Sequence, residues 1–202
     1  CGAPRHAVAV GAVPGAKPEL VERHARVLGH RTAVVAAALN LGGQRASAWP
    51  AILLGFALEK VVAESTGGAR PGSRIGDLNV LWELEEGLRA QALPAAVNRA
   101  AYYMSNWDGF LETVRNTGVL PSLFPADLAI PMVAPKDLGE VAAARLMTSL
   151  DDRGVRYVEG PRRYTPSDVA RAFAETLGRP VEVRVVPRAA WRQTFVSQGF
   201  SE

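Results

Sequence analysis

Two short strand-like segments, each preceded by a helical pattern, most constrain the fold of this chain. The first, "TAVVAAALNLGG" at 32–43, follows a helical pattern at 18–29. It is apolar with little polar alternation, which is typical of a strand covered on both faces in a parallel sheet. The second, "LPAAVNRAAYY" at 93–103, follows a helical pattern at 76–91. Helix followed by strand, twice, predicts a doubly wound α/β sheet.

The clearest local signal lies in the second half of the chain, in "YTPSDVARAFAETLG" at 164–178. Thr165 and Asp168 form a variant of the capping box, and Pro166 stands at the first helical position. Gly178 is typical of the residue that ends a helix. These signals predict a helix from Pro166 to Leu177. Its buried stripe is expected to consist of Val169, Phe173 and Leu177.

The rest of the second half predicts a smaller α/β unit. A helical pattern covers 136–150, the alternating segment "VEVRVVP" at 181–187 predicts a strand, and a short helix is predicted after it. We therefore divide the chain into 1–107 and 108–202. The segment at 48–65 also has a helical pattern, so it is either an extra helix or an insertion.

Composition excludes several classes of protein. The chain has 202 residues, 48% of them hydrophobic, which is enough for a sizeable core, and a net charge of only +3. The basic residues are scattered among acidic ones, so we expect no nucleic-acid partner. No apolar run reaches the roughly 20 residues of a membrane span, and no signal peptide is recognisable. With one cysteine, Cys1, a soluble cytoplasmic protein is expected.

Several segments resemble the NmrA-like branch of the atypical short-chain dehydrogenases. The most specific pieces are "RAAYYMSNW" and "GPRRYTPSDVA", and the likeness extends over roughly 30–202. The resemblance implies a partial Rossmann-like NAD(P)-binding domain at 1–107 and a small C-terminal substrate domain at 108–202. It also implies a small-molecule substrate, with NAD or NADP as cofactor. A homodimer is one open alternative for the oligomeric state.

The early part of the chain departs from this family. A Rossmann cofactor site normally begins with a Gly-rich turn that holds the pyrophosphate. Here "VAVGAVPGAKPE" at 8–19 lacks the G-x-G-x-x-G spacing and is more similar to the fourth strand of the family and the loop after it. We expect that about the first third of the usual domain is missing, through truncation or divergence. Weak dinucleotide binding is the consequence.

Catalytic residues cannot be assigned from the sequence. Short-chain dehydrogenases commonly use a Tyr-x-x-x-Lys pair, but "FALEK" places Phe56 four residues before Lys60, and phenylalanine has no proton to give. We interpret Lys60 as an ordinary exposed helix lysine rather than a catalytic one. Glu85 matches a glutamate common in the family, and it either faces the core near the cofactor or is a solvated or capping carboxylate.

The resemblance also implies a set of site residues. The segment after the second strand would pass the nicotinamide end of the cofactor, with Asn106 directing a polar group of the ligand. In the alternative interpretation, the aromatic residues seal a junction and Asn106 caps a helix that begins near Asp108. The expected cofactor contacts are Ala37, Ala38, Arg99, Ala100 and Tyr102, and the expected substrate pocket is formed by Tyr103, Met104, Asn106 and Trp107.

Two function classes remain open. The first is an NAD(P)H-dependent oxidoreductase that acts on a quinone-like or other conjugated acceptor. The second is a non-enzymatic dinucleotide-sensing regulator, a partner-binding protein or a truncated inactive homologue. We expect no metal site, because His24 and His30 are six residues apart and so lie on different faces of a helix.

Overall fold

The computed structural model describes residues 32–36 and 59–197. These residues form two compact units. One contains the described residues up to Tyr102 together with Val133–Glu159, and the other contains Tyr103–Met132 and the described residues from Gly160 onward.

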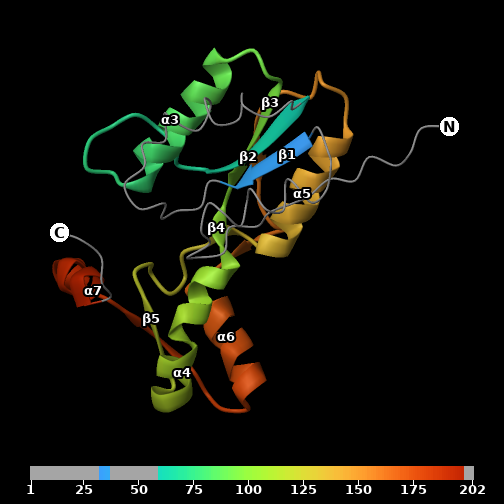
Figure 1. Cartoon of the computed structure of the whole chain (residues 1–202). Coiled ribbons are helices and arrows are strands. Elements are labelled where there is room, and N and C mark those ends of the chain that lie inside the picture. Colours follow the sequence, from blue (N-terminus) through green and yellow to red (C-terminus); the bar gives the residue numbers. More distant parts are fainter. Residues whose placement is uncertain (1–31, 37–58, 198–202) are drawn as a thin grey trace. The chain divides into compact units, whose positions relative to one another are not determined.

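The first unit is built on a four-stranded parallel sheet (Figure 1). Its strands, in spatial order, are β1 (Thr32–Ala36), β2 (Lys60–Thr66), β3 (Ala95–Ala100) and β7 (Gly154–Val158). Parallel neighbours need a crossover connection. Helix α3 (Asp77–Ala90) connects β2 to β3, and helix α5 (Pro135–Met147) precedes β7. All four strands end at one edge of the sheet, which we call the carboxyl edge.

The two helices cover opposite faces of this sheet (Figure 1). Successive residues of a strand point to opposite faces, so β2 and β3 supply two separate cores. The core on the α3 face contains Val61, Ala63, Ala69, Leu81, Leu84, Leu88 and Val97. The core on the α5 face contains Val62, Ala96, Ala142 and Leu146. The run Val61–Ala63 is apolar throughout because both of its faces are buried.

Local signals explain where the helices begin. Gly76, directly before α3, has a φ of 56°, a conformation that glycine adopts at little cost. Pro135 occupies the first position of α5, where its missing N–H group costs nothing.

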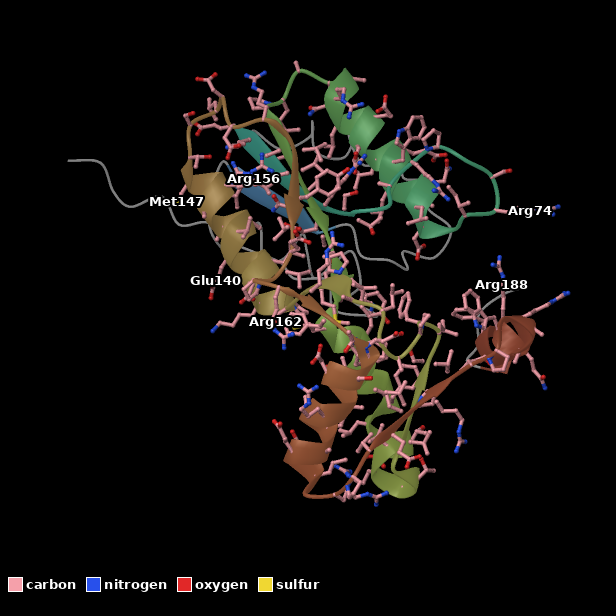
Figure 2. All side chains as sticks on the ribbon, turned by 180° about the vertical axis from the view of Figure 1, so that it is seen from behind. Arg74, Glu140, Met147, Arg156, Arg162 and Arg188 are labelled. Carbon is pink, nitrogen blue, oxygen red and sulfur yellow. The ribbon has the colours of Figure 1, made fainter. Side chains whose placement is uncertain are left out.

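Strand β7 lies at the edge of the sheet, and four of its five residues are exposed, among them Arg156 (Figure 2).

The second unit consists of short elements. Its helical elements are a 3-10 helix at Met104–Phe110, α4 (Leu111–Thr117), α6 (Pro166–Leu177), a 3-10 helix at Arg188–Ala190 and α7 (Trp191–Ser197). Strand β5 (Val119–Ser122) pairs in parallel with β9 (Glu182–Val185). Strand β6 (Ile130–Val133) pairs antiparallel with β8 (Arg163–Tyr164), and β4 (Tyr102–Tyr103) belongs to the same three-stranded sheet.

Helix α6 has the two ends that its sequence predicts. The Thr165 hydroxyl accepts a hydrogen bond from the Asp168 backbone N–H at 3.0 Å, and the Asp168 carboxylate accepts one from the Thr165 N–H at 3.0 Å. Gly178 ends the helix in the left-handed conformation, with a φ of 65°. The predicted stripe of Val169, Phe173 and Leu177 is half-buried, while Pro166 and Ala170 are buried.

The α/β prediction is confirmed, and one local prediction is wrong. The parallel strands at 32–36 and 95–100, and the helices at 77–90 and 135–147, form as expected. The segment at 60–66 is a central strand and not the end of a helix. Its β-branched valines pack between two helices, which outweighs the helical spacing. The helix expected at 18–29, with His24 and His30, lies outside the described residues.

Membrane-spanning helices are not found in the described part of the chain, where every helix is too short or too polar to cross a bilayer.

The capping box yields a stability prediction. Thr165→Ala removes the side-chain acceptor for the Asp168 N–H, so urea unfolding should show a loss of about 1 kcal/mol. Thr176→Ala is the matched control, because Thr176 is exposed on the same helix and bonds only the Ala172 carbonyl. The control should not be destabilised, since alanine is the better helix former. Equal stability of the two variants would contradict this role of the cap.

Candidate functional site

A row of polar side chains crosses the sheet one residue before the carboxyl edge. Ser65 of β2 is in register with Arg99 of β3, and Arg99 is in register with Tyr157 of β7. Each is the penultimate residue of its strand. Because the pairing is parallel and in register, the three side chains lie on one face of the sheet, the face covered by α3.

Glu85 of α3, the helix that covers this face, binds two members of the row, Ser65 and Arg99. Its Oε1 accepts a hydrogen bond from the Ser65 hydroxyl at 2.5 Å and another from Arg99 Nε at 2.9 Å. Its Oε2 accepts one from an Arg99 terminal nitrogen at 2.7 Å. Two parallel bonds from one guanidinium fix both side chains, which is the strongest geometry for such a pair. Only 2% of Glu85 and 3% of Ser65 are exposed.

The second terminal nitrogen of Arg99 reaches Tyr157. It donates to the phenol oxygen at 3.0 Å, and the guanidinium carbon lies 5.7 Å from the centre of the ring. The hydrogen bond with Glu85 is the main cause that raises the pKa of Arg99 above its usual range, so the side chain stays cationic. Tyr157 is 65% exposed. We call Ser65, Glu85, Arg99 and Tyr157 the carboxyl-edge cluster.

Small residues follow the strands beside this cluster. Gly67 and Gly68 come directly after β2, and both are exposed. The Gly67 N–H donates to the carbonyl of Ala100, the last residue of β3, at 2.8 Å. Ligands of doubly wound sheets bind beyond the carboxyl ends of the strands. Gly67 and Gly68 place no side chain in front of the end of β2.

The opposite face carries a second polar row, one residue earlier in each strand. Glu64, Asn98 and Arg156 are in register. Glu64 Oε1 accepts a hydrogen bond from the Asn98 amide at 2.9 Å, and its buried Oε2 has no hydrogen-bond partner among the described residues. Burial raises the pKa of Glu64 to about 7, against smaller opposing effects of Asn98 and Arg145. Glu64 can therefore exchange a proton near neutral pH.

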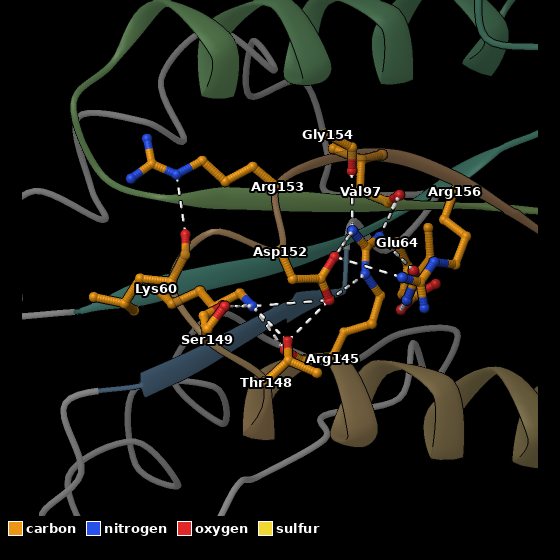
Figure 3. Close-up of polar contacts among 12 residues, drawn as sticks. Lys60, Glu64, Val97, Arg145, Thr148, Ser149, Asp152, Arg153, Gly154 and Arg156 are labelled. Carbon is orange, nitrogen blue, oxygen red and sulfur yellow. Dashed lines mark hydrogen bonds and ion pairs between the residues drawn. The ribbon is translucent and has the colours of Figure 1, made fainter.

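Arg145 of α5 lies on this face and donates hydrogen bonds to β3, to the first residue of β7 and to Asp152 before β7 (Figure 3). It is 2% exposed, and its guanidinium donates five hydrogen bonds. The acceptors are the carbonyls of Val97 and Gly154, the Asn98 side-chain oxygen and both carboxylate oxygens of Asp152. Hydrogen bonding to Arg145 is the main cause that lowers the pKa of Asp152 to about 2.

Lys60 is the second buried cation of this network, and its interpretation as an exposed helix lysine is wrong. It begins β2, is 1% exposed, and donates to the Arg145 carbonyl, the Thr148 hydroxyl and the Ser149 carbonyl at 2.8 to 3.0 Å (Figure 3). Burial lowers its pKa, although Asp152 opposes this. With its donors bound to the chain, Lys60 is neither an exposed helix lysine nor available to a ribose.

The structure places the predicted cofactor residues as follows. Arg99 lies in the carboxyl-edge cluster, Ala100 is 3% exposed and Tyr102 is half-buried. Ala37 and Ala38, like Phe56 and Cys1, lie outside the described residues. Glu85 faces the core as the resemblance implies, so its interpretation as a solvated or capping carboxylate is wrong. A helical stripe that includes Leu81, Leu84 and Leu88 turns Glu85 inward as well.

The predicted pocket residues belong to the second unit. Tyr103 and Met104 are half-buried, Trp107 is 4% exposed, and Asn106 is exposed. Asn106 lies inside the 3-10 helix, and α4 begins at Leu111 after Phe110 without a side-chain cap. The alternative that Asn106 caps a helix near Asp108 is therefore wrong. The pocket itself stays a prediction.

Sequence reasoning missed Ser65, Tyr157, Glu64 and Arg145. Two of them carry a signal, since Glu64 in "VVAEST" and Arg145 in "AAARLM" are charged residues within apolar segments. Such residues are buried only when paired or protonated. Ser65 and Tyr157 carry no such signal, because their importance depends on strand register.

Comparison with known proteins supports the fold. No family model matches the chain. A curated relative, (4-alkanoyl-5-oxo-2,5-dihydrofuran-3-yl)methyl phosphate reductase from Streptomyces griseus subsp. griseus, is 31% identical over 100 residues. This match covers 49% of the present chain and 35% of the relative. The chain thus matches about a third of that reductase.

Solved structures extend the likeness to most of the chain. The NADPH-dependent quinone oxidoreductase of Escherichia coli, in complex with NADPH, has a TM-score of 0.70 at 16% identity, over 86% of this chain and 61% of its own. The triphenylmethane reductase of Citrobacter sp., in complex with NADP(H), has a TM-score of 0.65 at 16% identity, over 92% and 66%. The fold is Rossmann-like, as in these NAD(P)-binding reductases. The narrower NmrA-like assignment stays a prediction.

The buried ion pair yields a second prediction. Glu85→Gln leaves the Arg99 cation beside a neutral amide in a largely buried place, so urea unfolding should show a loss of about 3 to 5 kcal/mol. Glu86→Gln is the control, because Glu86 is the next residue along the helix and its carboxylate pairs with Arg89 on the surface. The control should change stability by less than about 1 kcal/mol. Similar losses in both variants would contradict a structural role of the Glu85–Arg99 pair.

Glu64 yields a prediction about pH. Its pKa is raised on folding from 4.5 to about 7, so the folded state holds the proton more tightly than the unfolded state. Its contribution to stability is complete below pH 4.5 and is lost as the pH rises through about 7, by up to about 3 kcal/mol.

Glu64→Gln isolates this effect from other titrating groups. The amide mimics the protonated acid, so the variant should match the wild type near pH 4.5 and exceed its stability at pH 8. Urea unfolding of both proteins across this range provides the measurement. A stability difference that does not depend on pH would contradict the raised pKa.

Proposed function

We propose that this protein is an NAD(P)H-dependent oxidoreductase that acts on a quinone-like or other conjugated acceptor. The observation that supports it most is the carboxyl-edge cluster, which places a fixed cation and an exposed phenol at the edge of a Rossmann-like sheet. Ligands of such sheets bind at this edge. The similar solved structures include NADPH-dependent reductases, and the curated relative is a reductase.

The described residues fit one end of a dinucleotide better than the other. Gly67 and Gly68 are exposed and place no side chain beside the cluster, where a flat ring is proposed to bind. The early Gly-containing stretch of the sequence, at 8–19, lacks the G-x-G-x-x-G spacing of a pyrophosphate-binding turn, so we expect weak binding.

In this proposal the bound cofactor supplies a hydride, and the protein supplies orientation and charge. Glu85 and Ser65 hold Arg99 in one position, and Arg99 in turn holds Tyr157. Tyr103, Met104, Asn106 and Trp107 are proposed to bind the substrate as part of an NmrA-like substrate domain. A preorganised cation stabilises negative charge that develops on an acceptor.

A non-enzymatic dinucleotide sensor is the second candidate. The observation that favours it is Lys60, whose ammonium group is held by three hydrogen bonds inside the protein. The lysine that would hold a ribose in a Tyr-x-x-x-Lys pair is therefore unavailable at this position. A sensor would bind the dinucleotide without oxidising it.

Titration of NADPH fluorescence, followed by NADPH oxidation with duroquinone, tests the proposal. We expect binding weaker than low-micromolar, together with duroquinone-dependent oxidation. Gly67→Val should lower the oxidation rate at least about tenfold, since a bulky side chain would obstruct the carboxyl edge. The new Cβ itself is tolerated, because its nearest atom is the Ala100 carbonyl oxygen at 3.4 Å.

Ala90→Val is the control. Ala90 is the exposed last residue of α3, and the chain runs from there to the start of β3 and not to its carboxyl end. It should leave the rate unchanged. Binding without oxidation would favour the sensor, and the absence of binding at millimolar NADPH would contradict both candidates.

A further inference from the structure

The hydrogen bond between Arg99 and Tyr157 determines what the phenol can do. A guanidinium has only donors, so the Tyr157 oxygen accepts this bond. The phenol hydrogen therefore remains for another partner, and no acceptor for it is found in the described part of the chain. Tyr157 thus presents an unused proton donor.

Among the members of the carboxyl-edge cluster, Tyr157 is the one that a ligand can reach. It is 65% exposed, whereas Glu85 and Ser65 are almost completely buried and the Arg99 side chain is 16% exposed. Glu85 and Ser65 hold Arg99, and Arg99 bonds the phenol oxygen. Water can reach the same oxygen and restore its proton.

We infer that Tyr157 donates the proton to the carbonyl oxygen of the reduced acceptor, a role that rests on the proposed oxidoreductase function. The acceptor gains a hydride, which adds two electrons and leaves negative charge on its oxygen. The Tyr157 O–H bond breaks as a new O–H bond forms on that oxygen. The phenolate then takes a proton from water, so the step consumes one hydride and one proton in total.

Arg99 is a positioning residue for this step. Its terminal nitrogen stays within hydrogen-bond distance of the phenol oxygen, so its positive charge faces the negative charge that forms when the proton leaves. The two hydrogen bonds from Glu85 hold the guanidinium in this position. Tyr157 thus supplies the proton, and Arg99 supplies the fixed positive charge.

This inference narrows the substrate class. A quinone or a conjugated carbonyl acquires charge on oxygen when it accepts a hydride, and it needs a proton. A cationic dye becomes neutral with the hydride alone and gains nothing from a phenol. The cluster therefore fits acceptors with a carbonyl oxygen.

Tyr157→Phe tests the inference, because it keeps the exposed ring beside Arg99 and removes only the hydroxyl. The rate of duroquinone reduction by NADPH should fall about 100-fold or more, which is the usual contribution of a general acid. NADPH binding measured by fluorescence should stay unchanged. Tyr164→Phe is the control, because Tyr164 lies beside Arg162 in a comparable pair of the second unit, and it should keep the wild-type rate.

A second measurement does not depend on turnover. The chain contains four tyrosines, so labelling their ring carbon next to the hydroxyl gives few NMR signals. Duroquinone alone should shift one of them, and that signal should be missing in Tyr157→Phe. A wild-type rate in Tyr157→Phe, or no shift of its signal, would overturn the inference while the oxidoreductase proposal stands. A wild-type protein that does not oxidise NADPH would overturn the proposed function and the inference with it.

Discussion

The first unit depends on the burial of Arg145. A buried guanidinium that lacks even one partner is costly, and this one has a partner for each of its five donors. The partners come from β3, from the first residue of β7 and from the turn before it, so the bonds fix α5 against both strands. The carbonyl of Arg145 also accepts from Lys60 at the start of β2. One residue thus connects three neighbouring strands.

The two faces of the sheet carry different polar networks. On the α5 face, Lys60, Arg145 and Asp152 form a network that is closed within the protein and holds the strands together. On the α3 face, the Glu85–Arg99 pair is equally fixed, but Arg99 also bonds the exposed phenol of Tyr157. Because adjacent residues of a strand point to opposite faces, Asn98 and Arg99 belong to the two different clusters. The first holds the strands together, and the second ends in an exposed phenol beside the carboxyl edge.

The architecture could be predicted from the sequence because it depends on local patterns. Apolar spacing identifies α3, and the capping box fixes where α6 begins. Lys60 was misjudged because its burial depends on residues 85 to 92 positions later in the chain, which no local pattern reveals. The same holds for Tyr157, which becomes important only because its strand is in register with β3. Long-range pairing, and not propensity, decides which polar residues form the site.

The fixed ion pairs also limit how this site can work. Arg99 cannot leave Glu85 to bind an anion without stranding a buried carboxylate, so a mobile phosphate clamp at this position is unfavourable. A cation that cannot move can still stabilise charge at a neighbouring oxygen, since preorganised charges need no rearrangement during the reaction. The neighbouring oxygen here is that of the Tyr157 phenol, which accepts a hydrogen bond from Arg99. If the proposed function holds, this arrangement suits proton transfer to a small acceptor better than the binding of a multiply charged group at Arg99.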